Sequence, residues 1–307
     1  MSNPTGCLKD RVIIITGAGR GIGREIALLA SREGAKIVVN DLGTSSRGEG
    51  RDEGPAQQVV SEIKAQGGAA VASVESVAEW TGAQQIVKTA LDAFGRVDGL
   101  VNNAALLRDK IFHKLEPEDW HAVLNVNLNG SFNMARAVAP HMRQQNSGAF
   151  VHMTSTSGLI GNFGQAHYAS SKIGIAGLSR SIALDMAAFN VRSNCISPFA
   201  WTRLVATIPA ESAGEIARVE RMKQMGPEKI APLAVYLLSD AAEGITSQIF
   251  AVRQNEIMLM SQPRPLRSVH RGEGWTPQTI GEHAIPALKA NFYPLERSTD
   301  VFSWDPI

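Results

Sequence analysis

A short run of β-branched residues at positions 12–15 leads at once into a glycine-rich turn and then into a helical pattern. The run Val-Ile-Ile-Ile is typical of a buried strand. Positions 16–23 read Thr-Gly-Ala-Gly-Arg-Gly-Ile-Gly, and glycines let backbone N–H groups approach a pyrophosphate at the N-terminus of a helix. Turns use glycine in any case, so the cluster alone is a weak signal, but its place between a strand and a helix makes it a strong one. The segment therefore predicts the first strand, phosphate-binding loop and helix of a βαβ unit.

The alternation of short apolar runs and longer helical patterns continues along most of the chain. Further strands are expected at residues 36–39, 69–73, 97–101, 149–154, 191–196 and 248–252. Helices are expected at residues 21–33, 56–66, 83–94, 117–143, 166–190 and 228–239. Near-continuous apolar strands that alternate with helices predict an α/β fold with a doubly wound parallel sheet of the Rossmann type. In such a fold, ligands bind at the carboxyl ends of the strands.

Two segments depart from this alternation. Residues 43–55 are rich in glycine and charge, which is typical of a surface loop. Beyond Ser261 the pattern becomes irregular and proline-rich, yet it carries five aromatic residues, Trp275, Phe292, Tyr293, Phe302 and Trp304. We predict a single domain over residues 1–260 and a C-terminal extension over residues 261–307, which packs on the domain or on a neighbouring subunit.

The composition excludes several classes of function. The 307-residue chain has a formal net charge of +1, which gives no electrostatic argument for binding nucleic acid or an anionic membrane. No run approaches about 18 consecutive apolar residues, so no membrane span is expected, and the polar first ten residues do not resemble a signal peptide. Cys7 and Cys195 could form a disulfide, but two reduced thiols in a cytoplasmic protein are the simpler interpretation. Without zinc-like Cys/His spacing, no metal site is expected.

Asp41 follows the second expected strand, 24 positions after Gly17. A carboxylate there can accept both ribose hydroxyls of NAD and would repel the 2′-phosphate of NADP. The residue could also belong to a turn before Gly43. Arg20 is a conflicting signal, because a base in the phosphate loop could bind that 2′-phosphate. We expect NAD as the cofactor on the evidence of Asp41, because placing a carboxylate beside a phosphate costs more free energy than losing one exposed arginine contact.

Tyr168 and Lys172 lie four residues apart in an expected helix and therefore share one face. A free tyrosine has a pKa near 10, too high for efficient acid–base chemistry at neutral pH, and a nearby ammonium lowers it by favouring the phenolate. Ser155 ends the fifth strand, 13 residues before Tyr168, where its hydroxyl can bind a substrate oxygen and stabilise developing charge. Asn127 lies in a helical stretch, where it could bond backbone or water and extend a proton path from Lys172.

Each of these residues also has a purely structural interpretation. A Tyr–Lys pair at helical spacing is usually a solvated face, Ser155 could belong to a turn, and Asn127 could end a helix. The joint arrangement favours function, because all four residues accompany a cofactor loop on one sheet. We therefore predict an oxidoreductase in which Tyr168, backed by Lys172, moves the proton while the cofactor moves a hydride.

Together these pieces resemble the short-chain dehydrogenase/reductase family over about residues 8–252. The resemblance is carried by residues 16–23 (TGAGRGIG), 102–105 (NNAA), Asn127, Ser155, 168–172 (YASSK), and the Ser-Pro pair at 197–198 followed by Thr202. It implies a catalytic tetrad of Asn127, Ser155, Tyr168 and Lys172. It also implies that the cofactor contacts Gly17, Arg20, Gly21, Ile22, Gly23, Asp41, Ser76, Val77, Asn103, Ala104, Tyr168, Lys172, Pro198 and Thr202.

Two positions depart from the family pattern. Ala105 replaces the usual glycine of the asparagine motif, and Phe199 replaces the glycine that normally follows the proline, beside the nicotinamide. Within the family, the sequence is most similar to the (3R)-hydroxyacyl-CoA dehydrogenase domains of peroxisomal multifunctional enzymes type 2. This likeness rests on residues 39–43 (VNDLG), 88–98 (KTALDAFGRVD), 107–109 (LRD) and 161–168 (GNFGQAHY). Those domains carry His at the position of Asn127.

The resemblance implies NAD-dependent oxidation of a 3-hydroxyacyl-CoA, in lipid metabolism. A steroid or other bulky secondary alcohol is the alternative substrate, and a catalytically silent binding protein is a remote alternative. The basic tail residues Arg264, Arg267, His270 and Arg271 could meet CoA phosphates or form a solvated stretch. Residues 199–226 are expected to cover the substrate, with apolar Trp201, Leu204, Val205, Ile208 and Met222 acting in a lid or in plain helix packing. The family also implies a homodimer or homotetramer.

Overall fold

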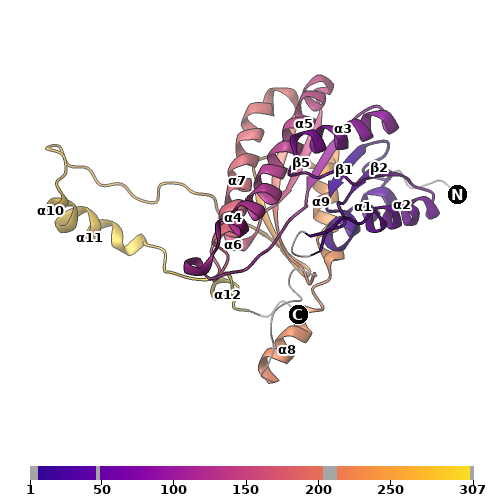
Figure 1. Cartoon of the computed structure of the whole chain (residues 1–307). Helices are drawn as coiled ribbons and strands as arrows, with labels where there is room; N and C mark the ends of the chain where they lie inside the picture. The colour runs from indigo at the N-terminus through magenta and orange to yellow at the C-terminus, as the bar shows by residue number, and fades with distance from the viewer. Residues whose placement is uncertain (1–5, 46–48, 203–212, 305–307) are drawn as a thin grey trace.

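The computed structural model describes residues 6–45, 49–202 and 213–304, which form an eight-stranded sheet with helices on both faces (Figure 1). The strand order is β3-β2-β1-β4-β5-β6-β7-β8. The strands are β1 (Val12–Thr16), β2 (Lys36–Asn40), β3 (Ala69–Ser73), β4 (Gly99–Asn102), β5 (Gly148–Met153), β6 (Val191–Phe199), β7 (Ile249–Arg253) and β8 (Glu256–Leu259). Every neighbouring pair is parallel except β7 and β8. The predicted doubly wound parallel sheet is confirmed, with one antiparallel edge strand added.

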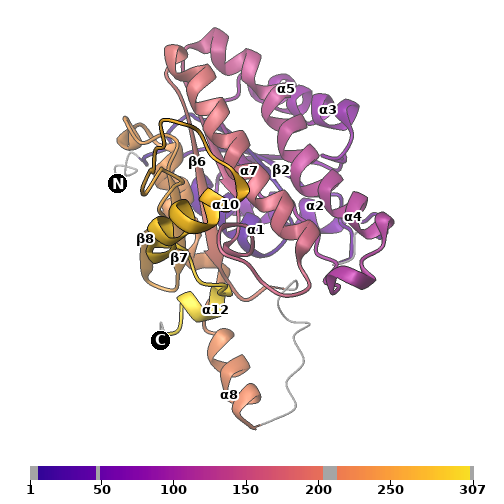
Figure 2. The ribbon, with the colours of Figure 1, turned by 90° about the vertical axis from the view of Figure 1, so that its left-hand side faces the viewer.

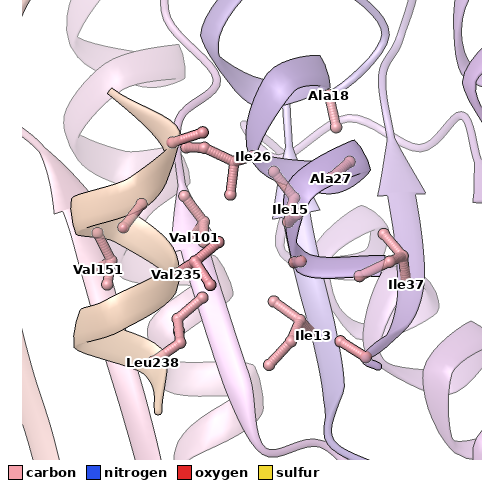
Figure 3. Close-up of a cluster of buried hydrophobic side chains, with 14 of the residues drawn as sticks. Ile13, Ile15, Ala18, Ile26, Ala27, Ile37, Val101, Val151, Val235 and Leu238 are labelled. Atoms are coloured by element: carbon pink, nitrogen blue, oxygen red, sulfur yellow. The ribbon is translucent and has the colours of Figure 1, made fainter. Parts of the chain in front are cut away.

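The strands are apolar on both sides because helices bury both faces of the sheet. One face packs against α1 (Gly21–Arg32), α2 (Gly54–Ala65) and α9 (Ala231–Leu238). The other packs against α3 (Trp80–Phe94), α5 (Gly130–Gln145) and α7 (Ala166–Met186). Within β1, Ile13 and Ile15 pack toward α1 and α9 (Figure 3), whereas Val12 and Ile14 belong to the cluster on the opposite face. This alternation explains the unbroken β-branched run in the sequence.

The helical stretch predicted over residues 117–143 contains an irregularity that the sequence periodicity does not indicate. It consists of α4 (Pro117–Leu124), a π-helical turn over Asn125–Asn129, and α5. A π-helical turn adds a residue to the helix and is frequent at functional sites. Asn127 lies in this turn and is fully buried.

The C-terminal extension begins after β8 and has two distinct parts. It carries the short helices α10 (Pro277–Thr279), α11 (Ile285–Leu288) and α12 (Ser298–Val301). In Figure 1, α10 and α11 lie on an arm far from the sheet, and the chain then returns to place α12 beside α6 (Thr156–Leu159). Phe292 and Tyr293 of the arm are 56% and 82% exposed, whereas Phe302 packs on Phe199 at the end of β6. The extension thus meets the sheet domain at its start, where Gln262 Nε2 donates to the Ser247 carbonyl, and again through its last described residues.

Two further observations bear on the sequence expectations. In the described ranges, no helix is long and apolar enough to cross a membrane. Cys7 is exposed, Cys195 is buried, and both are free thiols, as predicted.

Candidate active site

The loop between β1 and α1 is built from glycines at positions where a side chain would not fit. Gly17 and Gly21 have φ angles of 62° and 54°, which L-residues rarely adopt. A Cβ atom at Gly23 would lie 2.3 Å from the carbonyl oxygen of Gly17, and one at Gly19 would lie 2.8 Å from an oxygen of Asp41. The start of α1 is therefore a bare backbone surface with N–H groups at a helix N-terminus. Its shape and chemistry fit a dinucleotide pyrophosphate.

The end of β4 fixes this loop from the neighbouring strand. Thr16 Oγ1 accepts the backbone N–H groups of Asn103 and Ala104, at 3.0 and 3.1 Å. Asn103 Nδ2 donates to the carbonyl oxygens of Thr16 and Gly17, both at 2.9 Å. Asn103 thus holds two carbonyl groups of the loop in place, and Ala104 lies beside it, bonded to Thr16.

Asp41 lies beside the loop rather than in an isolated turn. Its two carboxylate oxygens accept the backbone N–H groups of Gly19 and Gly43, each at 2.8 Å. Arg20, the conflicting signal, is exposed and has Asp52 at 3.9 Å. The carboxylate is therefore fixed beside the glycine loop, while the arginine charge is partly balanced by a second carboxylate.

The remaining expected cofactor residues lie in separate parts of the structure. Thr202 approaches the phosphate loop, because its Cγ2 is 3.7 Å from the position of a Cβ at Gly21. Pro198 lies in β6, opposite Val252 of β7. Ser76, Val77 and Ile22 have structural contacts: Ser76 Oγ accepts the Ala78 N–H at 3.2 Å, Val77 packs on Gly130, and Ile22 packs on the core around α1.

Tyr168 and Lys172 share one face of α7, beside the carboxyl end of β5. Lys172 Nζ lies 5.5 Å from the centre of the Tyr168 ring and donates to the carbonyl oxygen of Met153 at 2.7 Å. Thr154 Oγ1 donates to the backbone carbonyl of Lys172 at 2.6 Å. The lysine is only 2% exposed, so the Tyr–Lys pair is not a solvated helix face.

Ser155 begins the short helix α6 directly after β5. Its Oγ accepts the backbone N–H of Ser157 at 3.1 Å, which is an N-cap bond. The Ser155 side chain also lies near the Tyr168 hydroxyl and lowers the pKa of that phenol. The structure therefore brings Ser155, Tyr168 and Lys172 to the end of one strand.

Asn127 connects α7 to the loop after β4 through its side chain. Its Oδ1 accepts the Leu106 N–H at 2.7 Å, and its Nδ2 donates to the Leu106 carbonyl at 3.1 Å and to Ser171 Oγ at 3.2 Å. Its backbone carbonyl accepts the hydroxyl of Ser131 at 2.6 Å. Backbone, one of the partners expected for this side chain, is confirmed at Leu106.

Burial dominates the titration of the site. It raises the pKa of Tyr168 to about 12, although the nearby Ser155 side chain lowers this pKa, and the charge of Asp109 raises it further. Burial lowers the pKa of Lys172 to about 8. Burial and the charge of Lys172 lower the pKa of His152 to about 4, so this histidine is neutral at pH 7. The expectation that Lys172 depresses the tyrosine pKa is therefore wrong for the polypeptide by itself, because the desolvation of the phenolate outweighs the effect of a nearby amine.

The structure also places residues at the site that the sequence argument did not assign. Asp109, Ser157 and Gln165 surround Ser155 and Tyr168. Two of these positions fall within the quoted LRD and GNFGQAHY segments, so the family pattern contained a signal for them. The ring of Phe302 lies 5.0 Å from that of Phe199 in an edge-to-face contact. This contact gives a structural reason for a large side chain at position 199 in place of the family's glycine.

The segment expected to cover the substrate is only partly described. Leu204, Val205 and Ile208 lie outside the described residues. The backbone N–H of Trp201 donates to the Met225 carbonyl at 2.7 Å, which joins the two ends of this segment. Between them, α8 (Ala213–Met222) projects away from the sheet (Figure 2).

Comparison with known proteins agrees with this geometry. Residues 11–211 match the family described as short chain dehydrogenase. The chain is 46% identical to the Mycobacterium tuberculosis short-chain type dehydrogenase/reductase Rv0148, over 76% of this chain and 79% of that protein. It is 39% identical to the mouse peroxisomal multifunctional enzyme type 2, over 89% of this chain but only 36% of that enzyme. A solved 7α-hydroxysteroid dehydrogenase in complex with NADH and 7-oxo glycochenodeoxycholic acid is 31% identical, with a TM-score of 0.73, and covers 83% of this chain and 98% of its own.

Proposed function

The chain belongs to the short-chain dehydrogenase family of NAD(P)-dependent oxidoreductases, and we propose that it oxidises a 3-hydroxyacyl-CoA to the 3-keto thioester with NAD. One observation carries the proposed chemistry. Tyr168 lies between Ser155 and the buried Lys172 at the carboxyl end of β5, on the same edge of the sheet as the glycine loop after β1. This edge is where a doubly wound sheet binds its ligands.

The residues of the chain divide the work as follows. The backbone N–H groups at the start of α1 would hold the pyrophosphate, and Asp41 would accept the ribose hydroxyls. Bound NAD would supply the two-electron acceptor for the carbinol carbon. Tyr168 removes the hydroxyl proton, and Ser155 hydrogen-bonds the reacting oxygen as negative charge develops on it. Because burial is the largest of the effects that raise the pKa of Tyr168 to about 12, the polypeptide does not produce a ready phenolate, and positive charge beside the ring must favour the phenolate that takes the proton.

NAD, rather than NADP, is supported by the carboxylate of Asp41. Both of its oxygens already accept backbone N–H groups, so the carboxylate cannot easily turn away from an incoming 2′-phosphate. We expect Asp41→Ser to lower kcat/KM for NAD at least tenfold and to improve the NADP-to-NAD ratio. The measurement is initial rates with both cofactors; wild-type protein that uses NADP at least as well as NAD would contradict this assignment.

An acyl-CoA substrate is supported by the likeness to the mouse multifunctional enzyme, which spans 89% of this chain. The chain matches only about a third of that enzyme, so the likeness concerns one region of it. The basic tail residues Arg264 and Arg271 give no added support, since the first bonds the Pro263 carbonyl and the second pairs with Glu273. Their segment leads out to α10, away from the sheet (Figure 1), which favours a solvated stretch within one chain.

A steroid or other bulky secondary alcohol is the second candidate substrate. It is favoured by the structural likeness to the 7α-hydroxysteroid dehydrogenase, which extends over nearly all of that protein. Purified protein assayed with NAD against 3-hydroxyacyl-CoA thioesters and hydroxysteroids distinguishes the two. Turnover of steroids with none of the thioesters would overturn the first proposal.

The catalytic assignment has its own test. Tyr168→Phe removes only the phenolic oxygen, and we expect kcat to fall by about 10²- to 10⁴-fold while NAD binding persists. Unchanged turnover would overturn the mechanism, and absence of turnover in the wild-type protein with every alcohol tested would favour a silent binding protein.

A further inference from the structure

A row of four polar side chains runs from Ser155 toward the exposed edge of the site. Ser155 Oγ donates to Ser157 Oγ at 3.2 Å, and Ser157 Oγ donates to Gln165 Oε1 at 2.7 Å. Gln165 Nε2 then donates to both carboxylate oxygens of Asp109, at 3.1 and 3.0 Å. Asn162 Nδ2 adds a bond to Ser157 Oγ at 2.9 Å. The row joins α6, the loop before α7, the start of α7 and the loop after β4.

The carboxylate at the outer end determines the direction of every bond in the row. A carboxylate only accepts, so the amide of Gln165 must present its nitrogen to Asp109 and its oxygen to Ser157. Amide oxygens also only accept, so Ser157 must give its single hydroxyl hydrogen to Gln165. Toward Ser155, the hydroxyl of Ser157 can therefore act only as an acceptor.

This direction leaves Ser155 Oγ with one lone pair and one hydroxyl hydrogen that can bond other groups. One lone pair of Ser155 Oγ accepts the Ser157 N–H at 3.1 Å. Because the Ser157 hydroxyl cannot donate, the second lone pair remains available to the hydroxyl of Tyr168 or of the substrate. The hydrogen of Ser155 has a weak, long partner in Ser157 and can turn to the reacting oxygen as charge develops there. Interactions that strengthen only in the transition state raise kcat rather than lower KM.

We propose that Gln165 and Ser157 are positioning residues that keep Ser155 with one free lone pair and one mobile hydrogen, and that Asp109 fixes the orientation of the Gln165 amide. The proposal rests on the proposed dehydrogenase function but not on the identity of the alcohol, since it concerns only the oxygen atom that reacts. It names three residues outside the tetrad as determinants of the rate.

Two single variants test the row. Gln165→Met keeps the length of the side chain and removes its hydrogen bonds to Ser157 and Asp109. We therefore expect kcat to fall about tenfold with the KM values changed less than twofold. Gln165→Glu places a second carboxylate against Asp109, and the two share a proton only at lower pH. Once protonated, the new carboxyl group donates to Asp109 and accepts from Ser157, as the amide does. The ratio of variant to wild-type kcat is therefore expected to rise as pH falls from 8 to 6.

The other charged or titratable groups around this position do not compete for the same proton. Arg108 and Lys110 of the loop after β4 pair with Asp119, at 3.1 and 3.3 Å. On α7, His167 Nε2 lies 2.7 Å from the Arg108 carbonyl, and the neutral Tyr168 titrates far above this range. The charge of His167 lowers the pKa of Asp109, but this histidine is present in wild type and variant alike, so its effect cancels in the ratio. The pH effect of Gln165→Glu is thus assigned to the pair that it forms with Asp109.

A double variant distinguishes an effect of hydrogen-bond direction in the row from an effect of side-chain packing. In Asp109→Asn with Gln165→Glu, the new amide donates to the new carboxylate, which accepts from Ser157, so the repulsion between two carboxylates is removed and the original direction at Ser157 is kept. We expect kcat to recover to within threefold of wild type at pH 7.5, without the pH dependence of Gln165→Glu. The exposed Gln85→Glu on α3 is the matched control for the charge change and should leave kcat unaltered.

All variants are measured beside the wild-type chain on whichever secondary alcohol it oxidises with NAD. Wild-type protein that oxidises none of them refutes the proposed function. Active wild-type protein together with a Gln165→Met kcat within twofold of it, a flat pH ratio for Gln165→Glu, or no recovery in the double variant overturns the positioning proposal and leaves the dehydrogenase function intact.

Discussion

The cofactor side and the substrate side of the site are held together by different kinds of contact. On the cofactor side, side chains bond backbone groups: glycines let α1 begin against β1, and the Asn103 side chain bonds two carbonyl groups of the same loop. On the substrate side, side chains also bond one another between separate segments, as when Gln165 Nε2 donates to the Asp109 carboxylate across 56 residues. The cofactor side therefore has almost no freedom to vary, whereas the substrate side is assembled from separable parts.

The two sides also differ in what they bury. The cofactor side buries neutral backbone groups that are paired, but the substrate side buries the amine of Lys172, which has one described bond, to Met153. Burying an amine disfavours its charged form and lowers its pKa, here to about 8. Catalysis thus retains a group that destabilises the fold near neutral pH, a trade-off common at active sites.

Lys172→Met removes the buried amine from the substrate side, and we expect it to give the largest effect on stability. In wild type, the pKa is about 8 in the folded state and near 10.4 in the unfolded state. Between these values the unfolded chain binds more protons, so wild-type stability rises with pH, by roughly 3 kcal/mol over the window. The variant lacks this term. Denaturant unfolding at several pH values should show wild type gaining on the variant from pH 8 to 10.5, with the variant inactive throughout.

The titration of Tyr168 does not obscure the stability difference expected for Lys172→Met. Its raised pKa acts in the opposite direction, but only above about pH 10, and the residue is present in both proteins. A stability difference between wild type and Lys172→Met that stays constant over pH 8–10 would mean that Lys172 is not desolvated in solution.

Gly23→Ala tests the rigidity of the cofactor side. The added Cβ would lie 2.3 Å from the Gly17 carbonyl oxygen and 2.6 Å from Asn103 Nδ2, so the loop must shift. We expect a loss of roughly 2–3 kcal/mol in the free energy of unfolding and at least tenfold weaker NAD binding, measured by calorimetry. Gly177→Ala is the matched control, because its Cβ would have no neighbour within 4 Å in α7; it should gain about 0.5–1 kcal/mol. Equal behaviour of the two variants would contradict the contrast.

The same contrast explains how far the sequence could predict the molecule. The glycine loop, Asp41 and the Tyr168–Lys172 pair are local patterns, so spacing alone placed them on the correct elements. The hydrogen bond between Gln165 and Asp109 spans 56 residues and depends on how two loops meet. Likewise, the π-helical turn around Asn127 has no periodicity of its own. The titration of Tyr168 was also beyond the sequence, because burial, rather than the neighbouring amine, controls it.

Phe302→Ala should give the smallest effect of these variants. It tests whether a change on the substrate side alters the KM for the alcohol without altering NAD binding. Phe302 packs edge-to-face on Phe199, and the two rings approach the buried guanidinium of Arg253, with Phe302 at 5.8 Å. Arg253 in turn donates to the Trp304 carbonyl at 3.0 Å, which holds the end of the extension on β7. Contacts between aromatic rings contribute about 0.5–1.5 kcal/mol, so we expect the KM for the alcohol to rise about threefold to tenfold. NAD affinity should stay within twofold, because no atom of the extension is described in contact with the glycine loop.

The control for this variant lies on the arm of the extension. Tyr293→Ala removes a comparably large ring that is 82% exposed and should leave both constants unchanged. If Phe302→Ala weakens NAD binding as much as it raises the KM for the alcohol, the two sides are coupled through Phe199, and the extension supports the whole site rather than its substrate side. If neither constant moves, the extension docks on the domain without shaping the site, and the aromatic ring at position 199 has another role. A selective change in KM would instead place the last described residues of the extension among the determinants of substrate choice, a role that the sequence pattern beyond Ser261 did not reveal.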